Sequence, residues 1–256
     1  MMQRSAALMT VVAHLALVAG CAPAGSSSAG GSASVTPDST VPAMAADMSG
    51  LTAAQRAAGW QPLFDGTTTA GWRGYKTPTV PAGWSAVNGT LTKSGPIGDL
   101  MTANQYGDFE LAFDWTISPG GNAGVFYRGT EEYDHIYWSA PEYQLLDDAL
   151  HGDGKSRLTS TGAAYGLYPS PGGVAKPAGE WNSTLIVVKG NRVQHWLNGQ
   201  KLLEYELANP DWTAKVKASK FIEYPNYGRA PRGYIGFQGD HEGTLTLRNM
   251  RIREIK

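Results

Sequence analysis

The chain has 256 residues, of which 42% are hydrophobic and 10% aromatic, enough for the core of one good-sized domain. Its 21 basic and 22 acidic residues give a formal net charge of -1, which argues against a surface that binds nucleic acid. The 32 glycines and 15 prolines favour many short strands joined by tight turns over a helical bundle.

The N-terminus has the form of a bacterial export signal. Arg4 precedes an apolar run over residues 6–18 that is too short to span a bilayer. The run leads into LVAGC, where small residues precede Cys21, a pattern that resembles the bacterial lipobox. Cys21 is the only cysteine in the sequence, so an internal disulfide is excluded. We expect a signal peptide over residues 1–20 and a lipid on Cys21 that alone holds the protein at the bacterial cell envelope.

The segment that follows is expected to be a flexible tether. Residues 21–50 consist mainly of Ala, Gly, Ser, Thr and Pro and have few large apolar groups to offset the entropy of ordering. Thr52 and Gln55 then form the T-x-x-Q pattern of a capping box, which predicts a short helix that stops at Gly59. The folded domain is expected over residues 51–256.

Period-two patterns and turn signals predict an all-β domain. Apolar and other residues alternate over residues 109–117, as in a strand with one buried face. Residues 193–197 and 200–207 flank Asn198-Gly199, a dipeptide that accepts positive φ in a β-hairpin. Further short strands are expected over residues 185–188, 234–237 and 245–255. No long amphipathic pattern follows Gly59, so we expect a concanavalin-like (lectin/glucanase) jelly-roll β-sandwich with a short N-terminal helix.

Two polar clusters accompany the middle strands. A glycine-rich turn at residues 120–124 leads into a strand that ends at Arg128, whose planar guanidinium can hold ligand oxygens or a buried carboxylate. Taken alone, a structural ion pair is the favoured role for this arginine. Further on, Glu142 and Gln144 would share one face of a strand. Together they could bind sugar hydroxyls and exchange a proton, or they could lie on a solvated outer face.

The third cluster is a loop near the C-terminus, residues 237–243 (FQGDHEG). His241 has a side chain suited to proton exchange near neutral pH, and Gln238 and Asp240 could orient it or share a metal with it. A histidine on the surface without function is the simpler alternative. His195, by contrast, alternates with apolar residues and is expected on the core side. Nucleotide-binding glycine loops, nucleophile elbows and zinc motifs are absent from the sequence.

These segments resemble the large bacterial family once known as domain of unknown function 1080, now described as 3-keto-disaccharide hydrolase or 3-keto-glucoside 1,2-lyase/3-keto-2-hydroxy-glucal hydratase. The resemblance extends from residue 59 to residue 256. It is carried by residues 59–66 (GWQPLFDG), 71–72 (GW), 122–128 (NAGVFYR), 142–147 (EYQLLD), 179–182 (GEWN), 195–199 (HWLNG), 219–221 (SKF) and 248–252 (RNMRI). One departure is QGDHEG at residues 238–243, where the family more often reads Gln-x-His-Gly.

The resemblance implies cleavage of 3-keto-glycosides, with a small sugar as the partner. A keto group at C3 acidifies the hydrogen on C2, so the glycosidic bond at C1 can break by elimination, and hydration of the glycal completes net hydrolysis. The implied roles are base for Glu142, enolate or hydroxyl contact for Arg128, and proton donor or metal ligand for His241. Further substrate contacts are expected from Asn122, Tyr127, Gln144, Asp147, Gln238 and Tyr224. A divalent metal cation held by Glu142, His241 or Asp147 is the candidate cofactor.

Two other functions stay open at this point. An ordinary glycoside hydrolase on the same fold needs two carboxylates that face each other at a defined separation. A non-catalytic carbohydrate-binding surface protein would instead stack sugar on exposed aromatic side chains, for which the candidates are Trp84, Trp138, Tyr224 and Tyr227. The enzymatic hypothesis requires that Arg128 and Glu142 converge over one sheet surface with room for a hexose ring.

Overall fold

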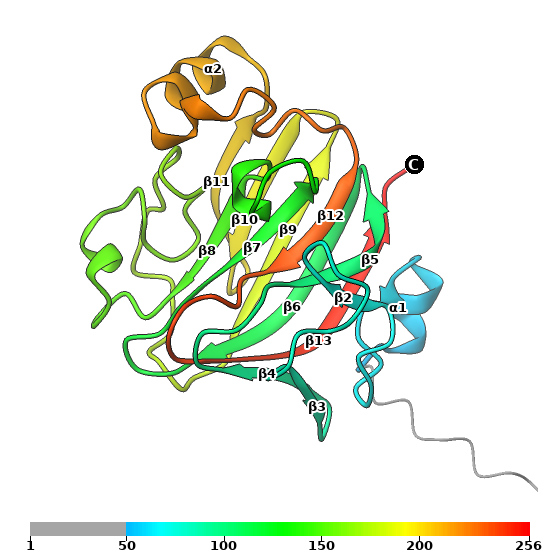
Figure 1. The fold of residues 1–256 in the computed structure, drawn as a ribbon. Coiled ribbons are helices and arrows are strands. Elements are labelled where there is room, and N and C mark those ends of the chain that lie inside the picture. The colour runs from blue at the N-terminus through cyan, green and yellow to red at the C-terminus, as the bar shows by residue number, and fades with distance from the viewer. Residues whose placement is uncertain (1–49) are drawn as a thin grey trace, which may run out of the picture. The chain divides into compact units, whose positions relative to one another are not determined.

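The computed structural model describes residues 50–256 of the chain (Figure 1). The expected signal peptide over residues 1–20, the lipidation site Cys21 and all but the last residue of the expected tether lie outside the described residues. None of the helices in residues 50–256 is both long enough and apolar enough to cross a membrane.

The expected N-terminal helix is present as α1 (Ala53–Ala57). The Thr52 hydroxyl accepts a hydrogen bond from the Gln55 backbone N–H at 3.2 Å, and the Gln55 side chain accepts one from the Thr52 backbone N–H at 2.9 Å. This reciprocal pair satisfies two N–H groups that the first turn leaves free, so the capping box is confirmed. Gly59 follows the helix with φ 88°, as its expected terminator.

Two antiparallel sheets form the body of residues 50–256. The larger sheet has the strand order β11 (Gln200–Glu206), β10 (Arg192–Leu197), β9 (Asn182–Lys189), β6 (Phe109–Ile117), β13 (Thr244–Glu254), β4 (Thr90–Ser94) and β3 (Ser85–Val87), with β1 (Gln61–Pro62) paired to β13. The smaller sheet has the order β2 (Trp72–Gly74), β5 (Leu100–Tyr106), β12 (Gly233–Phe237), β7 (Asn122–Gly129) and β8 (Glu142–Leu146). The expected β-sandwich is confirmed.

The core lies between the inner faces of these sheets. Along β6 the five alternating apolar side chains are all buried, as the period of two predicts: Phe109, Leu111, Phe113, Trp115 and Ile117. From the smaller sheet, Tyr143 and Leu145 of β8 and Val125 of β7 join the same cluster. Because successive side chains of a strand point to opposite faces, the residues next to these three along β7 and β8 point away from the core.

The expected hairpin and the buried histidine are also confirmed. Strands β10 and β11 are joined by Asn198 and Gly199, whose φ values are 49° and 81°. His195 of β10 is fully buried, with Nε2 2.9 Å from the Tyr127 hydroxyl and Nδ1 2.9 Å from the Gly162 carbonyl oxygen. Burial lowers the pKa of His195 to about 4, so this histidine is neutral and packs as part of the core.

One helix was not expected from the sequence. Helix α2 (Pro210–Lys217) follows β11 and is succeeded by the 3-10 helix η3 (Lys220–Glu223) (Figure 1). Asn209 caps α2 by accepting the Trp212 backbone N–H at 2.7 Å, and Pro210 occupies the first turn, where its missing N–H costs nothing. Only Trp212 of the helix is buried, so its eight residues carry no apolar stripe that a periodicity search would find.

Candidate active site

A cavity of about 250 Å³ opens on the outer face of the smaller sheet. Three strands supply its floor, with Asn122 from β7, Glu142 and Gln144 from β8, and Gln238 directly after β12. Its walls combine four aromatic side chains with four charged or titratable ones: Tyr137, Trp138, Tyr165 and Phe221, and Asp153, Lys220, Asp240 and His241. The prediction that Glu142 and Gln144 share one strand face is therefore confirmed, and the face is a cavity floor.

Glu142 is the most unusual group of this floor. Its side chain is only 8% exposed, and within residues 50–256 its carboxylate accepts no hydrogen bond. The carboxylate lies over Gly124 of β7, where a Cβ atom would overlap it and would lie 2.8 Å from the Glu142 Cγ atom. Burial raises the pKa of Glu142 to about 8, although the positive charge of Lys220 acts in the opposite direction. Glu142 is thus mostly protonated at pH 7.

Two amide side chains beside Glu142 offer free acceptors. The Gln144 side-chain N–H donates to the Asn122 side-chain oxygen at 3.1 Å, which fixes both amides. The Oε1 atoms of Gln144 and Gln238 are buried and have no hydrogen-bond partner within residues 50–256. A buried acceptor without a donor costs free energy, and a hydroxyl-bearing ligand would remove that cost.

His241 reaches the same cavity on a loop with a braced backbone. The Lys93 ammonium donates to the carbonyl oxygens of Gly239 at 3.3 Å and of His241 at 2.5 Å, and the Asp99 carboxylate accepts the Gly239 N–H at 2.8 Å. Burial lowers the pKa of His241, although Asp240, whose Oδ1 lies 3.8 Å from His241 Nε2, acts against the shift. His241 is therefore mostly neutral at pH 7, the opposite protonation state to that of Glu142.

Lys220 supplies a positive charge that sequence reasoning missed. It is the first residue of η3, a segment capped by the Ser219 hydroxyl, which accepts the Phe221 N–H at 3.2 Å. Its ammonium lies 4.7 Å from the centroid of the Tyr165 ring and 5.7 Å from that of Trp138. The SKF segment at residues 219–221, one of the matches that carried the family resemblance, was the only signal that pointed to it.

Arg128 does not join this site, so its expected convergence with Glu142 is wrong. Its side chain is 4% exposed, and its guanidinium donates to the Asp108 carboxylate at 2.9 Å and to the Gly107 carbonyl oxygen at 3.0 Å. The reason is local. The backbone of Arg128 has a φ of +54°, and this left-handed conformation interrupts the alternation of side chains between the two faces of β7 near the end of the strand. The ion pair that the residue type alone favoured is confirmed.

Three expected substrate contacts also lie elsewhere. Tyr127 is fully buried in the core, where its hydroxyl contacts His195 and Tyr205. Asp147 lies just past the end of β8 and accepts the Gly120 N–H at 2.7 Å and the Ala149 N–H at 3.2 Å. Tyr224 stacks on Trp138 with ring centroids 4.2 Å apart and lines a different cavity.

The candidate metal ligands do not converge. Glu142 and His241 line one cavity, whereas both carboxylate oxygens of Asp147 are held by backbone N–H groups outside it. Across residues 50–256 no three His, Cys, Asp or Glu side chains come together as a metal site. The residues do not fit a preformed site, so we derive no step through a metal, and the divalent cation stays a prediction.

Comparison with known proteins gives four results. The family model of the 3-keto-alpha-glucoside-1,2-lyase-like domain matches residues 59–253. A 3-keto-disaccharide hydrolase of Bacteroides thetaiotaomicron is 35% identical over 241 residues, which covers 82% of this chain and 83% of the relative. A crystal structure of a candidate glycosyl hydrolase from Parabacteroides distasonis is 31% identical with a TM-score of 0.76, over 81% of this chain and 99% of that one. A Bacillus subtilis protein with a galectin-like fold, 12% identical with a TM-score of 0.50 over 72% of this chain and 89% of that one, shares the fold alone.

Proposed function

The chain belongs to the 3-keto-alpha-glucoside-1,2-lyase-like family, and we propose that it cleaves the glycosidic bond of 3-keto-glycosides. The observation that carries this proposal is a buried carboxyl group, Glu142, which has no hydrogen bond within residues 50–256 and lies on the floor of a cavity that also holds a neutral histidine. Groups with pKa values shifted apart in one cavity are typical of acid–base catalysis.

The size and lining of the cavity support a single sugar ring as the bound unit. Its volume of about 250 Å³ is smaller than the roughly 300–1,000 Å³ of sites for drug-sized ligands. The Oε1 atoms of Gln144 and Gln238, which have no partner within residues 50–256, can accept hydrogen bonds from ring hydroxyls. Trp138 and Tyr165 offer ring faces to the apolar side of a sugar. The rest of a disaccharide or glucoside would extend toward solvent.

The proposed reaction is an elimination across C1 and C2 of the keto sugar. A base removes the hydrogen on C2, and the electron pair of that bond passes into an enolate with the C3 keto group. The enolate then forms the C1–C2 double bond as the C1–oxygen bond breaks, and an acid protonates the departing oxygen. Water can next add its hydroxyl to C1 and its proton to C2, which gives net hydrolysis.

The pKa shifts support a division of roles that reverses the expectation from the sequence. Glu142, with a pKa of about 8, carries a proton at neutral pH and is suited to protonate the departing oxygen. His241, whose pKa is lowered, is free to accept the proton from C2. Lys220 takes the place proposed for Arg128, because its ammonium is the cation of this cavity that can stabilise the enolate oxygen.

The decisive experiment compares two substrates. We expect the purified protein to release the aglycone from a 3-keto-glucoside and to leave the matching glucoside intact, because only the keto group acidifies the C2 hydrogen. Release from both substrates would indicate an ordinary glycoside hydrolase, and binding without turnover would indicate a carbohydrate-binding protein. Parallel assays with a chelator test the predicted divalent cation.

We further propose that the protein is exported and held at the bacterial cell envelope by a lipid on Cys21. The support is the LVAGC pattern at residues 17–21, since Cys21 itself lies outside the described residues. We expect Cys21→Ser to move the protein from the membrane fraction to the soluble fraction and to abolish incorporation of radiolabelled palmitate in a bacterial host. Continued recovery of the Cys21→Ser variant in the membrane fraction would contradict the anchor.

A further inference from the structure

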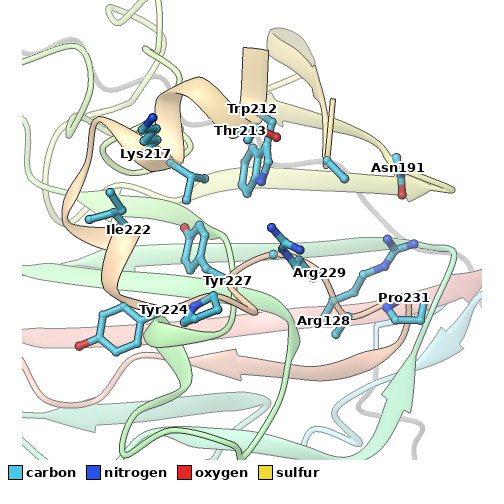
Figure 2. A pocket seen from close by; sticks show the side chains of 15 residues that line it. Arg128, Asn191, Trp212, Thr213, Lys217, Ile222, Tyr224, Tyr227, Arg229 and Pro231 are labelled. Carbon is cyan, nitrogen blue, oxygen red and sulfur yellow. The ribbon is translucent and has the colours of Figure 1, made fainter. Parts of the chain in front are cut away.

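A second cavity, of about 500 Å³, lies between α2 and the end of β7, and it shares no lining residue with the Glu142 cavity (Figure 2). In Figure 2 Trp212 and Tyr227 lie close together, and Arg229 and Arg128 lie to the right of Tyr227. Its volume falls within the range of about 300–1,000 Å³ that is usual for small-molecule sites. The proposed cleavage reaction makes no use of it.

The aromatic wall of this cavity is rigid. The Trp212 ring is stacked between Tyr205 and Tyr227, with ring centroids 5.4 Å and 5.8 Å away and interplanar angles of 5° in both cases. Gly228, at φ 66°, allows this packing, because a Cβ atom there would lie 2.6 Å from the Trp212 ring. A preformed wall lowers the entropy cost of binding a ligand.

The charge of the lining is positive. Three cationic side chains line the cavity, namely Arg128, Lys217 and Arg229, and no Asp or Glu does. Arg128 is paired with Asp108, whereas the side chains of Arg229 and Lys217 have no hydrogen bond or ion pair within residues 50–256. Ile222 also lines the cavity, and it is 53% exposed although it is a large apolar side chain.

We propose that this cavity binds a small amphipathic carboxylate. The guanidinium of Arg229 would hold the carboxylate through paired N–H donors, and the hydrocarbon part would cover Ile222 and Val216, which also line the cavity. Among the described residues, the Arg229 guanidinium is the one in this lining that has no partner, because the charge of Arg128 is already shared with Asp108, and one guanidinium matches one carboxylate. The site is independent of the proposed cleavage reaction.

The test is calorimetric titration of the full chain with hydrocinnamate, and with hydrocinnamide as its uncharged analogue. Hydrocinnamate is expected to bind and the amide to bind at least tenfold more weakly. Arg229→Gln should weaken hydrocinnamate binding roughly tenfold or more, as expected for loss of a charged hydrogen-bond partner. The matched control is Arg232→Gln, since Arg232 lies near Glu254 at 3.7 Å and does not line the cavity. Its affinity should equal that of the unchanged protein.

The binding site of hydrocinnamate is located from the indole N–H signals in an NMR titration. Hydrocinnamate should shift the signal of Trp212, which lines this cavity, and leave that of Trp138, which lines the Glu142 cavity. A shift at Trp138 alone, equal affinity for the amide, unchanged affinity in Arg229→Gln, or no binding at millimolar concentration would each overturn the proposal. Turnover of a 3-keto-glucoside, measured on the same samples, reports separately on the proposed function.

Discussion

Replacement of Glu142 by glutamine is expected to lower kcat/KM for an alkyl 3-keto-glucoside by about 10²–10⁴. Glutamine keeps the size of the side chain but neither gives nor accepts the proton on which the reaction depends. Stability should change little, because within residues 50–256 the Glu142 carboxylate has no hydrogen bond to lose and its neutral form is already favoured there. Steady-state kinetics and thermal unfolding measure the two effects.

The matched control for this substitution is Glu223→Gln. Glu223 is exposed on η3, close in sequence to Lys220, and does not line the Glu142 cavity. Its replacement should leave kcat/KM unchanged. If Glu142→Gln kept more than about a tenth of the activity on an alkyl 3-keto-glucoside, Glu142 would carry no proton in the rate-limiting step, whichever role is assigned to it.

The acid and base roles can be separated with two aglycones. A nitrophenolate leaves without protonation, whereas an alkoxide needs a proton as it departs. If Glu142 is the acid, Glu142→Gln should keep most of its activity on the nitrophenyl 3-keto-glucoside and lose it on the alkyl one. His241→Gln should lose activity on both. Loss on both substrates in Glu142→Gln would return the base role to Glu142.

The strand faces could be predicted from the sequence because alternation is a local property. The neighbours of Glu142 and Gln144 on β8 are apolar, and this placed both polar side chains on the outer face of the sheet. The same reasoning failed at Arg128, where a left-handed backbone conformation interrupts the alternation. A non-glycine residue with positive φ has only a weak signature in a single sequence.

Lys220 could not be predicted in the same way, because its place depends on tertiary structure. It follows β11 through α2, a helix with a single buried residue and no apolar stripe. The SKF match marks Lys220 as a residue of interest, but no periodicity around it indicates that it faces β8, a strand of the other sheet. Local periodicity carries no information about long-range contacts of this kind. Here such contacts bring Lys220, the one lysine that lines the described cavity, close enough to Glu142 to act on its pKa.

Gly124→Ala is expected to lower activity about 10²-fold while the fold stays intact. A Cβ atom at position 124 would overlap the Glu142 carboxylate and must push that side chain away from the cavity floor. A displacement of about 1 Å of a catalytic group commonly costs this much. The backbone at Gly124 does not have positive φ, so alanine fits its conformation and even reduces the entropy of the unfolded chain.

The structure therefore separates activity from stability at this position. The thermal midpoint of Gly124→Ala should equal or exceed that of the unchanged protein, since the nearest atoms to the new methyl group belong to one flexible side chain. Gly107→Ala is the matched control, because its Cβ atom would make only an ordinary contact, 3.4 Å from the Pro231 carbonyl oxygen. Full activity in Gly124→Ala would mean that the reaction tolerates a displaced Glu142. Loss of activity together with a lowered thermal midpoint would mean that the substitution destabilises the sheet. If Gly124→Ala is folded and inactive, the reaction requires the Glu142 carboxyl group at its position over β7.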